Sequence, residues 1–351
     1  MDFALAGGGL IVGFVVGLTG MGGGALMTPM LVVLFNVDPL AAVSSDLVAS
    51  ALMKPFGGAV HMRRGTVNLR LVAWLAAGSV PSAFAGVFVL RAFGDGQALQ
   101  DAVKTALGVA LLIAAASLTG KAYIALVERV RRRSRGERAP DSSVADIVVR
   151  PIPTLLVGVA GGLIVGMTSV GSGSLIIIAL LALYPRLQAS QLVGTDLVQA
   201  VPLVAAAAVG HLLYGDFQFT VAASLLVGAI PGVIAGAHAS SKAPAGFVRR
   251  ALALVLLASG LKLVGVGNGW IALAIVSALL LGPVVWMQVR RTQGLPALAR
   301  RERDARRARR ATDRAESAAG QPDDPDPDAV RTPHTVRVRA ATDDDDEEAR
   351  R

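Results

Sequence analysis

The sequence has no cysteine, few aromatic residues and little charge, and these shortages narrow the classes of protein to which it can belong. With 0 cysteines in 351 residues, neither a disulfide framework nor a cysteine metal site is available. Charged residues make up 17% of the chain and aromatic residues 5%, against 53% hydrophobic residues. The nucleotide-binding loop G-x-x-x-x-G-K-[ST] is also missing. We therefore expect no cofactor, no metal and no ATP hydrolysis by the chain itself.

Long apolar runs occupy most of the first 290 residues. Several reach the roughly 20 residues that a helix needs to cross the hydrocarbon core of a bilayer. The net charge is +9, and the arginines are concentrated in two loops and the C-terminal tail, which is typical of cytoplasmic segments rather than of a nucleic-acid interface. The pattern predicts an all-α, multi-pass protein of the cell membrane that binds no nucleic acid.

Two glycine-rich clusters interrupt the apolar segments 3–36 and 153–184. The first reads Gly17-Leu-Thr-Gly-Met-Gly-Gly-Gly24 and the second Gly166-Met-Thr-Ser-Val-Gly-Ser-Gly173, at an offset of 149 residues. Glycine destabilises a helix interior by about 1 kcal/mol relative to alanine. Each segment is therefore predicted to break, the first into pieces near 3–19 and 24–36.

The second half of the sequence repeats the first. After a slip of one residue the offset becomes 150, which matches Asp46 with Asp196, His61 with His211 and Pro81 with Pro231. Residues of such different types at one offset indicate an internal duplication. The chain is accordingly divided into a membrane repeat (1–119), a basic cytoplasmic loop (120–150), a second membrane repeat (151–265), an extra transmembrane helix (266–290) and a disordered, charged cytoplasmic tail (291–351).

Charge decides between two topologies. If each broken segment crosses the membrane once, nine spans place the basic tail outside, against the positive-inside rule. If each is a re-entrant hairpin, every basic cluster lies inside, and seven full spans plus two hairpins form an inverted repeat, as in secondary transporters. We predict the second arrangement and keep nine plain spans as the alternative.

The glycine clusters are candidate binding sites. Each would leave a half-helix whose free N–H groups and positive dipole end favour an anion, although close packing of small residues is the alternative. The second span adds Asp46 and Lys54 on one face, and burying such charges in a membrane costs about 2.5–3.5 kcal/mol each on insertion scales, so both should face protein or water. Lys54 either attracts an anion or pairs with Asp46, and Val204 occupies its position in the second repeat. The candidate substrate-binding residues are Thr19, Gly22, Gly23, Gly24, Ser45, Asp46, Lys54, Thr168, Gly171, Ser172, Gly173, Thr195 and Asp196.

Two histidines lie at matched ends of spans. Because histidine titrates near neutral pH, His61 and His211 are candidates for carrying a coupling proton. The alternative is an interfacial hydrogen-bonding role for both.

The motifs resemble those of a known family. Gly17-x-x-x-x-Gly22-Gly-Gly-x-x-x-x-Pro29-x-Leu31, followed by Ser45-Asp46-Leu47 and His61-x-x-x-Gly65, is similar to the TauE/SafE sulfite exporter family over about residues 5–265. This resemblance implies a membrane permease for sulfite, sulfonates or related organic anions. We therefore interpret the chain as a secondary transporter of small anions, driven by protons or membrane potential, and not as an enzyme.

Two alternative functions make different demands on the chain. A passive anion channel would show flux without coupling. An intramembrane hydrolase would need a Ser–His pair such as Ser50 and His61, but eleven residues along one helix separate these by roughly 16 Å. Outside the membrane core, the arginines from Arg290 onward are expected to bind anionic lipid headgroups.

Overall fold

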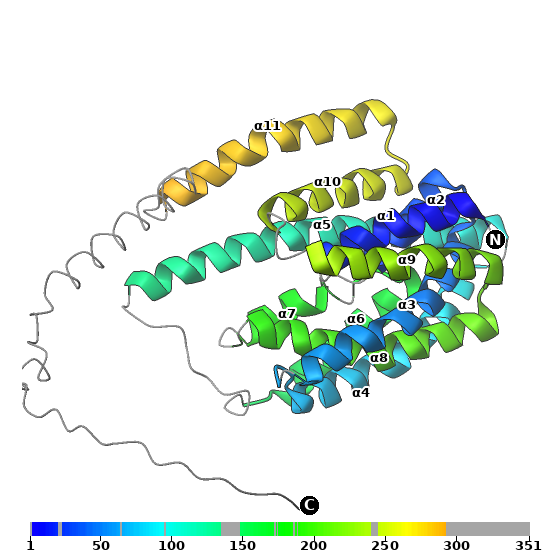
Figure 1. Cartoon of the computed structure of the whole chain (residues 1–351), viewed down its shortest axis with the longest axis horizontal. Coiled ribbons are helices and arrows are strands. Elements are labelled where there is room, and N and C mark those ends of the chain that lie inside the picture. Colours follow the sequence, from blue (N-terminus) through cyan, green and yellow to red (C-terminus); the bar gives the residue numbers. More distant parts are fainter. Residues whose placement is uncertain are drawn as a thin grey trace, which may run out of the picture. The chain divides into compact units, whose positions relative to one another are not determined.

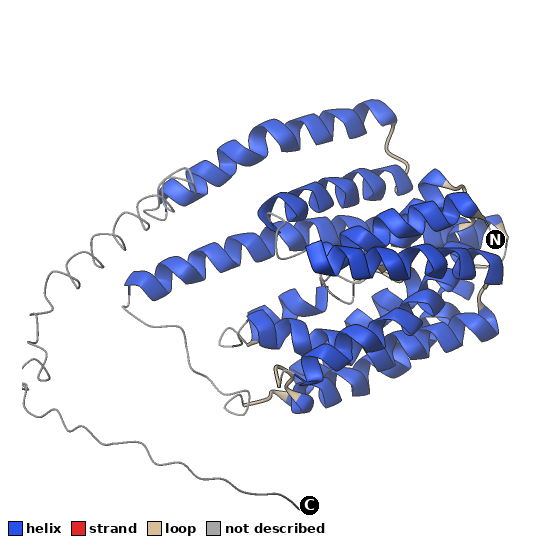
Figure 2. Ribbon diagram, in the orientation of Figure 1, coloured by secondary structure: helices blue, strands red, loops and turns tan. Residues whose placement is uncertain are grey.

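The computed structural model describes residues 2–19, 23–63, 65–94, 96–134, 148–171, 173, 175–184, 187, 189–239 and 245–292. The regular structure in these ranges is helical throughout (Figure 2), and 6 of the helices are long and apolar enough to cross a membrane. The prediction of an all-α polytopic membrane protein is therefore confirmed. Gly22 and Ser172 of the candidate site, residues 135–147 of the basic loop and the tail from residue 293 onward lie outside the described residues.

Each half of the duplicated chain forms a matching series of helices (Figure 1). A final helix, α11 (Asn268–Thr292), has no counterpart in the first half. The first half contains α1 (Phe3–Thr19), α2 (Gly24–Leu34), α3 (Pro39–Arg63), α4 (Leu69–Arg91) and α5 (Gln97–Ser134), and the second contains α6 (Pro151–Thr168), α7 (Leu175–Leu183), α8 (Ala189–Tyr214), α9 (Phe219–Ala239) and α10 (Ala245–Leu263).

The basic segment after the fourth span differs from expectation. A loop was predicted from residue 120, but α5 continues to Ser134. The extension is rich in Ala, Leu, Glu, Lys and Arg, which have high helix propensity, and Glu128 and Arg132 stand four residues apart, a favourable spacing on a helix. The apolar run therefore ends where the charged residues begin, whereas the helix continues through them.

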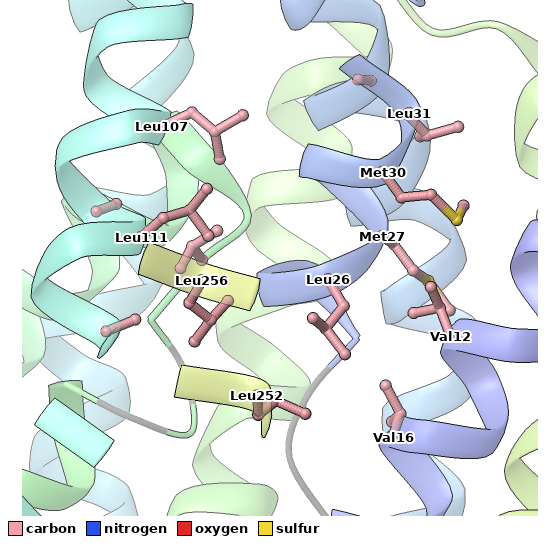
Figure 3. Close-up of a cluster of buried hydrophobic side chains, with 14 of the residues drawn as sticks. Val12, Val16, Leu26, Met27, Met30, Leu31, Leu107, Leu111, Leu252 and Leu256 are labelled. Atoms are coloured by element: carbon pink, nitrogen blue, oxygen red, sulfur yellow. The ribbon is translucent and has the colours of Figure 1, made fainter. Parts of the chain in front are cut away.

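Both broken segments fold back as hairpins. In Figure 3 the chain runs one way from Val12 to Val16 and returns from Leu26 to Leu31. At the open end of this hairpin, a Cβ on Gly8 would meet the side chains of Met30 and Phe35 at 2.9 and 3.0 Å.

The second hairpin closes in the same way. The Tyr184 hydroxyl, just after α7, lies 2.6 Å from Thr154 Oγ1 and accepts a hydrogen bond from Arg150 N at 2.8 Å, both at the start of α6. Phe35 and Tyr184 stand at the offset of 149. The hairpin topology, rather than nine plain spans, therefore describes both broken segments.

The two halves interlock. Helix α1 packs on α9 of the other half, α6 packs correspondingly on α4, and α3 packs on α8. Small residues allow these close approaches: a Cβ on Gly166 would overlap the backbone of Ala83, and one on Gly13 the backbone of Ala229. For these glycines, close packing explains why a residue without a side chain stands at each position.

Matched hydrogen bonds show that the halves are related as an inverted repeat. Asn68 N donates to Thr195 Oγ1 at 3.1 Å, and Gln218 N donates to Ser45 Oγ at 3.3 Å, so each partner is exchanged for its match at the offset of 150. Helices α3 and α8 run antiparallel, because Ser44 meets His211 while Gly58 faces Val198.

Candidate functional site

The two breaks, between α1 and α2 and between α6 and α7, lie close to one carboxylate group. Asp46, on α3, is fully buried. Its Oδ2 accepts hydrogen bonds from Thr28 Oγ1 of α2 at 2.6 Å and from Ser169 Oγ, at the end of α6, at 2.8 Å. Ser50 Oγ, one turn along α3, donates to Oδ1 at 3.4 Å. Asp46 thus joins the first hairpin, the second hairpin and the helix between them.

The backbone at the second break is shaped by two residues with positive φ. Ser169 caps α6 in the left-handed region (φ 59°), where its hydroxyl is aimed at Asp46. Gly171 has φ 127°, which favours glycine, and its carbonyl oxygen accepts bonds from Gly173 N and Leu175 N. Thr168 holds the turn from within, since its Oγ1 donates to Ile164 O and accepts from Val170 N. The predicted cluster residues Thr168, Gly171 and Gly173 therefore form the turn itself.

The first break presents the start of a half-helix to the second. Gly23 caps α2, and its carbonyl accepts from Leu26 N and Met27 N at 2.9 Å, so the ladder of α2 begins at Leu26. The amides of the first turn lie outside that ladder, as at any helix N-terminus. Gly24 packs directly on Ser169. Thr19 ends α1, and its side chain is outside the described part of the structure.

Lys54 and Asp196 form the second charged feature of the site. Lys54 is 9% exposed and Asp196 2% exposed. The lysine lies close enough to both aspartates to interact with them electrostatically. The lysine is therefore held near one carboxylate from each repeat. The sequence offers two roles for it, binding an anion or pairing with Asp46, and each role gives the ammonium group a negatively charged partner.

The structure separates other predicted residues from the breaks. Ser45 and Thr195 bond to Gln218 and Asn68, at the ends of the helix pairs. His211 is fully buried, with Nδ1 2.8 Å from Ser44 Oγ and Nε2 2.7 Å from Gly166 O. A carbonyl only accepts, so Nε2 carries a hydrogen.

The matched histidine has a different environment. His61 is only partly buried, and its Nδ1 lies 3.0 Å from Thr66 Oγ1. Ser50, once considered as its nucleophilic partner, is engaged with Asp46 instead. The structure therefore does not pair Ser50 with His61.

Sequence reasoning missed several residues of the site. Thr28 and Ser169 were not singled out, although Thr28 follows the first glycine cluster by one helical turn and Ser169 lies inside the second. Gln199, fully buried on α8 one turn after Asp196, donates from Nε2 to Ser79 Oγ at 2.8 Å. Its place on the face that carries Asp196 was the available signal.

Comparison with known proteins shows which family the chain belongs to. The family model described as "Sulfite exporter TauE/SafE" matches residues 5–263. The chain belongs to the TauE/SafE family. It is 41% identical over 257 residues to the probable membrane transporter protein YjnA of Bacillus subtilis strain 168, a match that covers 73% of this chain and 97% of that protein.

A second relative is more distant. The probable membrane transporter protein YdhB of the same organism is 22% identical over 253 residues, covering 72% of this chain and 96% of that protein. No solved structure matches the chain significantly. Membership of the TauE/SafE family, together with these relatives, identifies the chain as a multi-pass membrane transporter.

Proposed function

We propose that this TauE/SafE protein is a secondary transporter of small anions such as sulfite, sulfonates or related organic anions, coupled to protons or to the membrane potential. The observation that carries the proposal is the meeting of the two hairpin ends: Gly24 of α2 packs on Ser169 of α6, and both ends are tied to Asp46. Irregular backbone at membrane depth is tolerated where it is buried in protein or lines a cavity.

Two features support an anion as the substrate. The first turn of α2 presents backbone amides at the positive end of a helix dipole, an arrangement that favours negative charge. Lys54 adds a buried ammonium group. A neutral or cationic solute would gain nothing from either feature.

Inverted repeats support a transporter rather than a channel. In transporters of this design, discontinuous helices at the repeat interface hold the substrate while the halves rock around it. The antiparallel α3 and α8 and the matched hydrogen bonds of Asn68 and Gln218 fit that design.

Flux measurements test the proposal. The full chain is reconstituted into proteoliposomes, and uptake of radiolabelled sulfite, sulfoacetate and thiosulfate is followed with and without a pH gradient and a membrane potential. We expect saturable uptake of at least one anion that a gradient accelerates. Saturable uptake should fall in Gly24→Val, which overlaps Ser169, and persist in Gly7→Val, where nothing lies within 4 Å of the added Cβ. Flux that ignores both gradients would indicate a channel, and no saturable flux of any anion would refute the assignment.

For the tail we propose a cytoplasmic location and contact with anionic lipid headgroups. The support is the density of arginines between Arg290 and Arg314. Deleting residues 293–351 should weaken binding of anionic lipid to the purified protein without abolishing flux, and equal lipid binding by the truncated and full chains would contradict the proposal.

A further inference from the structure

Lys54 occupies a special position in the duplicated scaffold. Ser44 meets His211 at one end of the α3–α8 pair, and the matched residues His61 and Gly194 approach each other at the other end. Lys54 lies about midway between these contacts along α3, next to the axis that relates the two halves. Only one half supplies this charge, since Val204 stands at the matched position on α8.

The two aspartates lie on opposite sides of this lysine. Asp46 is near the Ser44 end of α3, whereas Asp196 is near the Gly194 end of α8. Lys54 interacts electrostatically with both.

The aspartates differ in what surrounds them. Asp46 accepts three hydrogen bonds from the hydroxyl groups of Thr28, Ser169 and Ser50. The matched positions around Asp196 carry no side-chain hydroxyl, because Ile177, Gly20 and Ala200 stand there. Asp46 is thus held by three hydroxyl donors that have no counterparts at the matched positions around Asp196.

A second acceptor lies beside Asp196. Gln199, one turn along the same face of α8, is fully buried, and its Oε1 has no hydrogen-bond partner among the described residues. A buried acceptor of this kind fits a group that carries a proton.

The charge balance then limits how an anion binds. Two carboxylates and one ammonium leave a net negative charge in the centre of the protein. An anion that takes Lys54 as its partner draws it from Asp196, and a buried carboxylate that loses its partner is strongly destabilised. Uptake of a proton by Asp196, from the water on the side to which the site is open, neutralises that carboxylate, so the net charge of the site is the same with the anion bound as without it.

We propose that Lys54 is the residue that binds the transported anion, and that Asp196 takes up the coupling proton when the anion displaces it from Lys54, while Asp46 is a structural carboxylate. This inference rests on the proposed function and assigns the coupling ion. The proton binds an Asp196 carboxylate oxygen on one side of the membrane and is released, with the anion, on the other. His211, with both ring nitrogens bonded, is left as a positioning residue.

Few other titratable groups lie on α8 and the helices packed on it. Helix α8 itself carries His211, and α3 carries Asp46, Lys54, His61 and Arg63. Helix α4 carries charge only near its ends, at Arg70 and Arg91, and α6 and α7 contain no titratable side chain.

Proton uptake during binding tests the inference directly. The purified full chain is titrated with methanesulfonate, which has no proton of its own to exchange near neutral pH, in two buffers of different ionisation enthalpy. Wild type should take up one proton per bound anion. Asp196→Asn should take up none and still bind within about tenfold of wild type, a difference of about 1.4 kcal/mol.

Matched variants complete this experiment. Asp46→Asn should keep the uptake of one proton per bound anion, and Lys54→Val should weaken binding by more than about tenfold. In proteoliposomes, Asp196→Asn should lose uptake driven by a pH gradient while keeping exchange of labelled for unlabelled anion. Proton uptake that persists in Asp196→Asn, or that is lost in Asp46→Asn instead, would overturn the inference and leave the proposed function standing.

Infrared difference spectra remove the dependence on the Asn variant. Anion binding should produce a protonated-carboxyl band in wild type that changes position in Asp196→Glu, and an unchanged band would overturn the inference. If wild type binds and transports no anion at all, the proposed function itself fails, and the inference with it.

Discussion

Gly24 and Ser169 lie so close together that a Cβ on Gly24 would overlap the backbone oxygen of Ser169. The two residues belong to different repeats, at the start of α2 and the end of α6. Their contact makes the two interruptions one feature of the molecule.

Gly24→Ala should therefore force the hairpin ends apart. Overpacking of this kind costs about 1–3 kcal/mol. Gly7→Ala is the control, because nothing lies within 4 Å of its added Cβ and alanine favours a helix by up to about 1 kcal/mol. Thermal unfolding in detergent should show a lower Tm for Gly24→Ala alone. Equal Tm values for the two variants would show that the contact is loose.

Ser169 combines a strained backbone with a hydrogen bond, and two substitutions separate these effects. Ser169→Ala loses the bond to Asp46, worth about 1.5–3 kcal/mol for a charged partner, and keeps the left-handed backbone. Ser169→Gly loses the same bond and recovers about 1–2 kcal/mol, because glycine adopts this conformation freely. Tm should therefore fall in the order wild type, Gly variant, Ala variant. An Ala variant at least as stable as the Gly variant would contradict the assigned backbone strain.

The matched histidines should respond differently to truncation. His211→Ala leaves Gly166 O buried without its ring partner, which should cost about 1–3 kcal/mol, whereas Ser44 Oγ keeps its bonds to Leu40 O and Asp216 N. His61 is partly exposed, so water replaces its ring and His61→Ala should cost less than about 1 kcal/mol. Chemical unfolding of the two variants in detergent gives the comparison. A larger loss for His61→Ala would refute the structural role given to His211.

The hairpin topology predicts which ends share a side of the membrane. Phe3 and Asp38 flank the first hairpin, and a membrane-impermeant maleimide should label Phe3→Cys and Asp38→Cys from the same side. Val148→Cys, before the second hairpin, should be labelled from the other side. The chain has 0 cysteines, so no background substitution is needed. Labelling of the first two positions from opposite sides would restore the nine-span alternative.

The positions of the helices could be predicted from the sequence because a helix that crosses the bilayer core needs about 20 apolar residues. Apolar length fixed most spans to within a few residues, and the glycine clusters located both breaks, since glycine has low helix propensity. The end of α5 could not be found in this way, because the arginine-rich extension is charged yet made largely of residues with high helix propensity. The hairpin turn was found only by adding the positive-inside rule.

The candidate site was predicted in part. Asp46, Lys54 and Asp196 stood out, because charge within an apolar run has few explanations. Thr28 and Ser169 carry common hydroxyl groups, and their bonds to Asp46 depend on tertiary contacts between segments distant in the sequence. The sequence likewise treats His61 and His211 as equals, and only burial distinguishes them.

The central claim, that an anion binds where the two half-helices meet, is tested most directly by protection of a single cysteine. Ala25 lies in the first turn of α2, and Leu34 ends that helix with 70% of its surface exposed. Sulfoacetate at ten times its dissociation constant leaves only about one-tenth of the sites empty. Maleimide modification of Ala25→Cys should then slow about tenfold, while that of Leu34→Cys stays constant. If sulfoacetate binds but both cysteines react at unchanged rates, the anion is held elsewhere and the account is contradicted.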